Sequence, residues 1–162
     1  MNGTPEVHDV SMLLPGPPTA VWAFFTDPHN LEAITPPWLR FRVLSPRSLV
    51  IREGALIDYR LRWRGLPIRW RTLISRWEPP DADGRGRFVD EQLRGPYRLW
   101  RHTHEFEPRD GHTLMRDRVE YLAPLAWLAH PLVVRRDVRG IFEHRAAVLR
   151  ARFGEIGQAS TG

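Results

Sequence analysis

Alternation of hydrophobic and polar residues predicts strands over much of this chain. Side chains on a strand point to its two faces in turn, so a period of two indicates a half-buried strand. This pattern predicts a first strand over residues 7–14 and later ones over Ile57–Trp63, Ile68–Ile74 and Met115–Tyr121. The pair Asp110–Gly111 precedes the last of these and is typical of a tight turn between antiparallel strands.

Two short helices are predicted directly after the first strand. One begins at Thr19 and is broken at Asp27-Pro28, and the next covers Pro28–Ile34. The second ends where prolines follow, because the residue before a proline is pushed out of helical geometry. From Trp38 the period changes to two, so we expect a strand to begin there. A long amphipathic helix is predicted over Leu132–Phe153, where apolar residues recur at three- and four-residue spacing.

The run Arg87–Phe106 supplies two more strands, which meet at Gly95-Pro96, and it carries polar residues on the face where a core would be apolar. The residues that share this face are Phe88, Asp90, Gln92, Trp100, His102, His104 and Phe106. An unpaired buried polar group costs roughly 1–3 kcal/mol, so a packed interior seldom accepts such a set. This face therefore predicts the wall of a ligand cavity.

The element order defines an α+β fold. The elements are one strand, two short helices, about six further antiparallel strands and a long C-terminal helix. The length of 162 residues suits one domain over residues 1–153, and we expect residues 154–162 to form a disordered tail.

Composition narrows the class of protein. All 24 basic side chains are arginines, the net charge is +5, and cysteine is absent, so disulfides are excluded. The first 14 residues lack the pattern of an export signal, which favours a cytoplasmic location. The longest apolar stretch, Leu122–Val134, falls well short of the ~20 residues that a membrane span needs.

The sequence resembles the SRPBCC superfamily of START-like and pollen-allergen-like proteins, in its cyclase/dehydrase-type branch, over nearly the whole chain. The motifs that carry the resemblance are Val21–Pro28 with Leu31 and Ile34-Thr35-Pro36, Asp90-Glu91-Gln92, Gly95-Pro96-Tyr97, Trp100, His102, His104-Glu105-Phe106, and Gly111-His112-Thr113 with Asp117. The resemblance implies a helix-grip fold, in which a curved antiparallel sheet of about seven strands has the long C-terminal helix over its concave face. The sheet and the helix would enclose a tunnel for sterols, lipids, polyketides or other apolar molecules.

The leading hypothesis is therefore binding of a small or medium apolar molecule that bears at least one polar group. The candidate ligand-binding residues are Tyr59, Leu61, Trp70, Gln92, Trp100, His102, His104, Asp117, Ile141, Phe142 and Arg145. Arg145 lies beside the apolar stripe of the last helix. It either reaches inward, to bind a ligand carboxylate or phosphate, or lies over apolar surface with its head in water.

Two alternatives from other classes stay open. The first is a cofactor-free cyclase or dehydratase, in which His102 or His104 and Asp117 act as acid and base. If Asp117 has no catalytic role, we expect it to form an ion pair with an arginine across the sheet. A metal held by His102 and His104 with Asp90 or Asp117 has no diagnostic spacing, so we expect no metal and no organic cofactor.

The second alternative is an interaction module that docks on an acidic partner through a basic ladder, which consists of Arg60, Arg62, Arg64, Arg69 and Arg71. The neighbouring tryptophans point inward by the same alternation, so nucleic acid would find no stacking platform and is not expected as a partner. A transient membrane contact stays open, as does a gate at the cavity mouth formed by Trp127, Leu128 and Leu132. The sequence does not define an oligomeric state.

Overall fold

Seven strands form one antiparallel sheet in the order β1-β7-β6-β5-β4-β3-β2 in the computed structural model, which describes residues 4–123 and 131–154. The strands are β1 (Glu6–Pro15), β2 (Arg42–Val43), β3 (Leu56–Trp63), β4 (Leu66–Glu78), β5 (Gly86–Arg94), β6 (Leu99–Arg109) and β7 (His112–Leu122). The helices are α1 (Pro18–Phe25), α2 (Leu31–Ile34) and α3 (Pro131–Phe153), with 3₁₀ turns η1 (Pro28–Asn30) and η2 (Pro37–Leu39).

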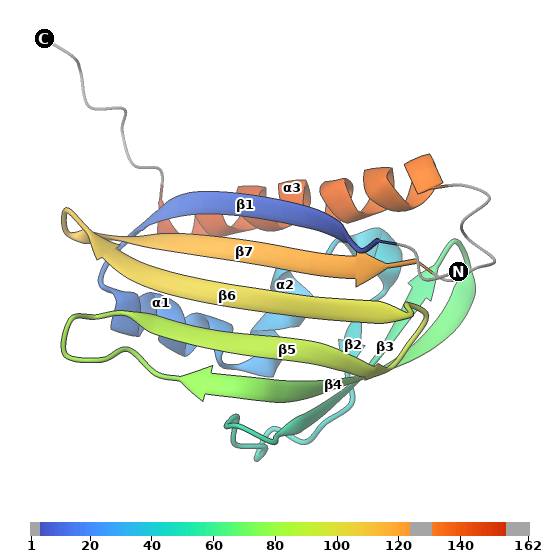
Figure 1. The fold of residues 1–162 in the computed structure, drawn as a ribbon, viewed down its shortest axis with the longest axis horizontal. Coiled ribbons are helices and arrows are strands. Elements are labelled where there is room, and N and C mark those ends of the chain that lie inside the picture. The colour runs from blue at the N-terminus through green and yellow to red at the C-terminus, as the bar shows by residue number, and fades with distance from the viewer. Residues whose placement is uncertain (1–3, 124–130, 155–162) are drawn as a thin grey trace, which may run out of the picture.

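The sheet curls around the helices, and all three helices lie on the same side of it (Figure 1). Helix α3 runs along the β1 edge, α1 lies against β6 and β7, and α2 contacts α3 and β2. This arrangement confirms the expected helix-grip fold, in which a curved sheet grips the last helix.

The connection between α2 and the sheet differs from the prediction. We expected a strand from Trp38, but Pro37–Leu39 form a 3₁₀ turn and Arg40 adopts a left-handed conformation with φ 44°. Strand pairing begins only at Arg42. Consecutive prolines fix φ at the start of this segment, so the alternation there reflects a turn that buries Leu39 and not a strand.

The predicted turn between β6 and β7 is confirmed. Asp110 and Gly111 have φ values of 50° and 79°, and Arg109 pairs with His112 across the turn. Two consecutive positive φ values are typical of the type I′ turn, whose twist matches that of the flanking strands. This tight turn sets the register of β6 on β7.

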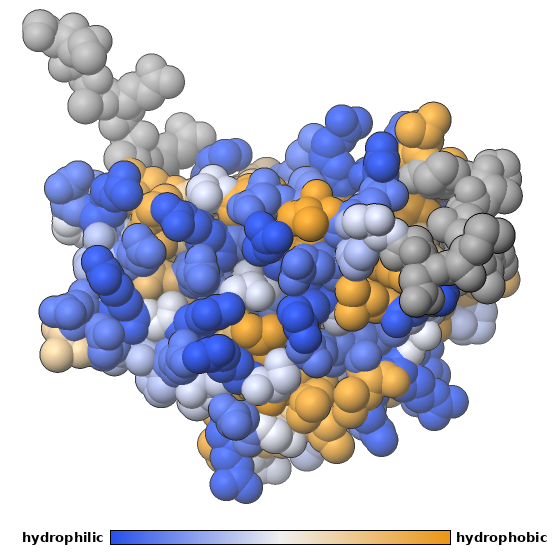
Figure 2. All heavy atoms as spheres, viewed as in Figure 1, coloured by the Kyte–Doolittle hydropathy of each residue, from blue (hydrophilic) through white to orange (hydrophobic). Residues whose placement is uncertain are grey.

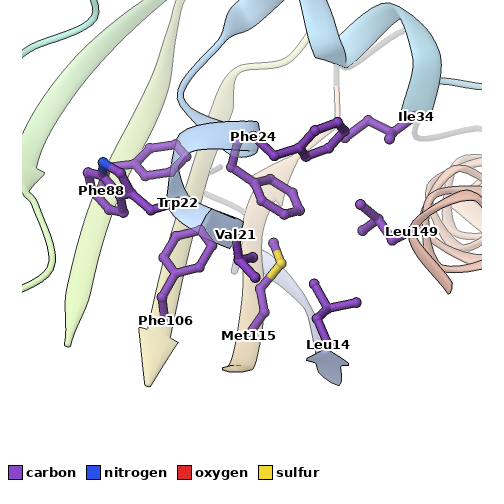
Figure 3. Close-up of a cluster of buried hydrophobic side chains, with 10 residues drawn as sticks. Leu14, Val21, Trp22, Phe24, Ile34, Phe88, Phe106, Met115 and Leu149 are labelled. Carbon is purple, nitrogen blue, oxygen red and sulfur yellow. The ribbon is translucent and has the colours of Figure 1, made fainter. Parts of the chain in front are cut away.

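One end of the concave side is filled by a core of aromatic and aliphatic side chains (Figure 3). Trp22 of α1 packs edge-on against Phe88 of β5 and Phe106 of β6, with ring centroids 5.5 and 5.4 Å apart. Leu149 joins α3 to the same cluster, in which Leu14 and Met115 also lie. This core fixes helix α3 at one end of the sheet.

The opposite face of the sheet is mainly hydrophilic, with smaller hydrophobic patches between charged residues (Figure 2). The arginine ladder is exposed, as alternation predicted, and Arg71 pairs with Asp58 at 2.8 Å. Among the described residues, no helix combines the length and apolar character needed to cross a membrane. Leu132 is exposed, whereas the predicted gate residues Trp127 and Leu128 and most of the predicted tail lie outside the described residues.

We predict that Leu149→Ala lowers the free energy of unfolding by about 2–5 kcal/mol, because it removes a fully buried side chain and leaves a cavity. Urea denaturation measures the loss. Leu93→Ala is the matched control, since Leu93 is 57% exposed whereas Leu149 is 1% exposed. Equal destabilisation by the two substitutions would contradict the position of α3 on the sheet.

Candidate functional site

A cavity of about 190 Å³ lies between the concave face of the sheet and helix α3. Its wall is mostly aliphatic and aromatic and comes from β3 to β6, α3 and the region of the short helices. Of the residues predicted to contact a ligand, those that line this cavity are Tyr59, Leu61, Trp70, Trp100, His102, His104, Ile141, Phe142 and Arg145. Gln92 and Asp117 are not among the lining residues.

The pairing of β5 with β6 places the polar residues of the wall opposite one another. Phe88 faces His104 and Asp90 faces His102 in this register. His104 also stacks on the ring of Phe88 at 4.1 Å. A register shift between Ile74 and Arg76 in β4 lies opposite Asp90, and such bulges bend a strand and redirect its side chains.

Asp117 of β7 joins three basic side chains behind the cavity wall. One of its oxygens, Oδ1, lies 3.0 Å from His102 Nε2 and 2.8 Å from His104 Nδ1. The contact with His102 has hydrogen-bond geometry, whereas His104 Nδ1 is poorly aligned and makes no hydrogen bond despite its short distance. Arg145 of α3 donates to Oδ2 at 3.4 Å. Asp117 therefore links the sheet to the helix.

Asp90 contacts the same two histidines from the cavity side. Its Oδ2 lies 2.9 Å from His104 Nε2 and 3.7 Å from His102 Nδ1. The Asp90 side chain is 18% exposed and lines the cavity, whereas that of Asp117 is 8% exposed and does not. A ligand would therefore meet Asp90 first. Sequence reasoning placed Asp90 on this face but did not choose it as a ligand contact.

The pKa values of the two histidines are shifted in opposite directions. Burial lowers the pKa of His102 to about 4, helped by the neighbouring charge of His104, so this imidazole is neutral at pH 7. Burial also opposes protonation of His104, but the carboxylates of Asp117 and Asp90 raise its pKa on balance. Despite burial, Arg145 and the histidines hold the pKa of Asp117 well below its usual range.

Arg145 is buried and does not extend into water. It is 8% exposed, and its guanidinium carbon lies 5.6 Å from the ring centroids of both Phe25 and Phe142. The structure thus places Arg145 inward, with Asp117 as its partner. The expected arginine partner of Asp117 comes from the helix and not from across the sheet.

Gln92 has a structural role at the end of β5. Its side-chain amide donates to the carbonyl of Tyr97 at 2.7 Å, and its Oε1 accepts from the Tyr97 backbone N–H at 3.2 Å. A Cβ at Gly95 would lie 2.3 Å from Gln92 Oε1, so a larger residue here would displace the Gln92 side chain from its hydrogen bonds with Tyr97. The motif Gly95-Pro96-Tyr97 is therefore explained by the closure of a turn, which positions Tyr97 on the cavity wall.

Thr72 and Tyr59 contribute further hydrogen-bonding groups to the cavity wall, and the sequence analysis did not predict that they lie near each other. Trp70 Nε1 donates to Thr72 Oγ1 at 3.1 Å, and Thr72 lies across the β3–β4 ladder near Tyr59. Burial, and next the charge of Asp90, raise the pKa of Tyr59, so its hydroxyl keeps its proton. Thr72 occupies an inward position of its strand, so the period of two is the signal that identifies it.

The fold and this enclosed, mostly apolar cavity define a helix-grip protein of the SRPBCC and START-like superfamily. A family model described as "Polyketide cyclase / dehydrase and lipid transport" matches residues 14–150. The chain belongs to this family. No curated protein matches the sequence.

Solved structures agree with the fold. The chain is similar to TTHA0849 from Thermus thermophilus, with 21% identity, a TM-score of 0.57 and coverage of 91% of this chain and 99% of that one. It is also similar to Ms6760 from Mycobacterium smegmatis, with 18% identity, a TM-score of 0.64 and coverage of 94% and 93%. The ginseng major latex-like protein 151 from Panax ginseng has 11% identity, a TM-score of 0.63 and coverage of 93% and 99%. At these identities the likeness concerns the fold alone.

We predict that Arg145→Met destabilises the protein by about 3 kcal/mol, because it leaves Asp117 as a buried carboxylate without its guanidinium partner. Thermal or urea unfolding measures this loss, and the added substitution Asp117→Asn should recover part of it. Arg139→Met on the same helix is the control, since Arg139 is 67% exposed and its pair with Glu143 is 3.6 Å long. A stability change no larger than that of the control would show that the buried pair does not form.

Proposed function

We propose that this protein binds a compact, neutral, apolar molecule that carries one hydrogen-bonding group. The observation that carries this proposal is the uneven distribution of polarity around the cavity. Ile57, Ile68, Ile141 and several aromatic rings line most of the wall, and a cluster of Asp90, His102, His104 and Arg145 contributes its polar part. An apolar site with a few converging polar groups is the usual form of a small-molecule site.

The cavity volume limits the size of the ligand. A dry cavity of roughly 150 Å³ accepts benzene, whereas sites for drug-sized molecules measure roughly 300–1,000 Å³. At about 190 Å³, this cavity suits a molecule of one or two rings or a short chain. A larger lipid would need the cavity to widen.

The charges around the cavity favour a neutral ligand with a hydrogen-bond donor. The charge of Arg145 is already paired with Asp117, which disfavours the role that the sequence suggested as one option, a clamp for a ligand carboxylate or phosphate. Asp90 is the carboxylate on the cavity side. A ligand anion would be repelled by it, whereas a ligand hydroxyl could donate a hydrogen bond to it.

For the catalytic alternative, the geometry favours a different pair of residues from the one that the sequence suggested. Acid–base chemistry needs a group within hydrogen-bond reach of the substrate, and Asp117 lies behind the histidines. Asp90 with His104 is the pair in place for that role, and their contact of 2.9 Å would orient the imidazole. Retained affinity with lost turnover after His104→Gln would favour an enzyme over a binding protein. A docking module would need no cavity, so the cavity favours a ligand over an acidic partner.

We predict that chelator-treated protein binds 2-naphthol at least about tenfold more tightly than 2-naphthoate, with naphthalene between them, because only the hydroxyl can donate to Asp90. Fluorescence of Trp63, Trp70 and Trp100, which line the cavity, reports binding. Asp90→Asn should reduce the preference for naphthol over naphthoate. Tightest binding of the carboxylate would contradict the proposed ligand class.

We predict that Ile141→Trp abolishes or strongly weakens naphthol binding, because the larger ring would occupy the cavity that Ile141 lines. Ala147→Trp places the same side chain on an exposed position of the same helix and should leave affinity unchanged. Titration calorimetry compares the two variants after circular dichroism has shown that both are folded. Unchanged binding by Ile141→Trp would place the binding site elsewhere.

A further inference from the structure

Three potential metal ligands converge on one point of the cavity wall. Asp90, His102 and His104 each offer one donor atom, and these three atoms lie within 4.8 Å of one another. Asp90 Oδ2 is 2.9 Å from His104 Nε2 and 3.7 Å from His102 Nδ1. Two ligands of a tetrahedral zinc ion are about 3.3 Å apart, given bond lengths of about 2.0–2.1 Å. Small side-chain rotations would therefore bring all three atoms to bonding distance of one ion.

The other nitrogen of each histidine already faces a carboxylate. His102 Nε2 and His104 Nδ1 both lie within 3.0 Å of Asp117 Oδ1. Histidine ligands of metals almost always donate their second N–H to a carboxylate, carbonyl or water, which fixes the ring and its tautomer. Arg145 holds the other oxygen of Asp117, so this supporting group is itself fixed.

The number of hydrogens in this cluster leaves room for a cation. A neutral imidazole has one N–H. In this structure His104 Nε2 is hydrogen-bonded to Asp90 Oδ2, and His104 Nδ1 makes no hydrogen bond although it lies 2.8 Å from Asp117 Oδ1. A shift of the His104 N–H to Nδ1 would direct both imidazole N–H groups toward Asp117. The remaining nitrogens would then present lone pairs toward Asp90 Oδ2, and three acceptors would face one another. One added proton could join Asp90 Oδ2 to only one of the two histidine nitrogens, His104 Nε2 or His102 Nδ1. A metal ion could bind all three atoms.

We propose that Asp90, His102 and His104 form a binding site for a divalent transition-metal ion such as Zn²⁺, Fe²⁺ or Co²⁺. Two histidines and one carboxylate that leave coordination positions open are a set that such ions accept. All three residues line the cavity, so the open positions would face a bound molecule. The inference stands apart from the proposed function, which concerns the metal-free protein, because the apolar wall of the cavity is present with or without the ion.

This inference departs from the expectation of a metal-free protein. The sequence offers only a pair of histidines two residues apart on one strand, which is no diagnostic spacing. The third ligand comes from β5, and its position opposite His102 depends on the register of β5 on β6. The supporting carboxylate comes from β7, opposite His104.

Metal titration of chelator-treated full-length protein tests the proposal. We expect calorimetry with ZnCl₂ to give one bound ion per chain, and CoCl₂ to give the visible absorption of a low-symmetry cobalt site. Asp90→Asn and His104→Gln should each weaken Zn²⁺ binding at least about tenfold, and Asp117→Asn about 10- to 100-fold. His144→Gln, which removes a histidine that contacts Trp38 outside the cluster, should bind as the wild type does.

Absence of stoichiometric Zn²⁺ binding would overturn the proposal, as would equal binding by wild type, Asp90→Asn and His104→Gln. Asp90 is partly exposed to the cavity and its replacement by Asn keeps the size of the side chain, so this variant stays informative if His104→Gln does not fold. Naphthol binding by metal-free protein is measured in parallel. Naphthol binding without Zn²⁺ binding would retain the proposed function and reject the metal site.

Discussion

The buried carboxylate of Asp117 is the interaction on which the rest of the site depends. It lies at the back of the cavity, where it contacts both histidines of β6 and accepts a hydrogen bond from Arg145 of α3. A buried carboxylate is costly unless it is paired and hydrogen-bonded, so these partners must come together for the fold to be stable. Their assembly fixes the imidazole rings and presents Asp90 and the two histidines to the cavity.

The cavity exists because the helix covers the concave side of the sheet without filling it. Phe106, Leu149 and their neighbours pack one end, and Val119, Val138 and Phe142 form a second cluster along α3. Between these clusters and the apolar residues of β3 and β4, a volume remains whose wall is lined largely by aromatic rings. Membership of the polyketide cyclase/dehydrase and lipid transport family agrees with such an interior.

Much of this arrangement was predictable from the period of two in the sequence. We expected one face of the sheet to carry Phe88, Asp90, His102 and His104. They do share a face, because side chains two residues apart on a strand point to the same side. The long final helix followed instead from the three- and four-residue spacing of apolar residues over Leu132–Phe153, and together the two patterns predicted the α+β fold. The 3₁₀ turn at Pro37–Leu39 was missed, since three residues cannot distinguish a turn that buries one side chain from the start of a strand.

The sequence could not predict which polar residues face the cavity and which lie behind its wall. Alternation assigns Asp90 and Asp117 to the inner face alike, but only the register of three strands and the position of α3 place Asp90 in front and Asp117 behind. Gln92 was expected at the wall, yet its amide is used by the backbone of Tyr97. The depth of Asp117 arises from pairing between distant segments, whereas the role of Gln92 arises from a local turn that brings Tyr97, five residues later, to its amide. Neither follows from the alternation of side chains along a strand.

The central claim is that a neutral apolar molecule lies between the sheet and α3, beside the polar cluster. Isotope-filtered nuclear Overhauser spectroscopy of the labelled protein with unlabelled 2-naphthol tests it most directly. The account predicts contacts from the naphthol ring to the methyl groups of Ile57, Ile68 and Ile141, which line the cavity. Contacts confined to exposed residues such as Leu66 and Leu93, with none to these isoleucines, would contradict it.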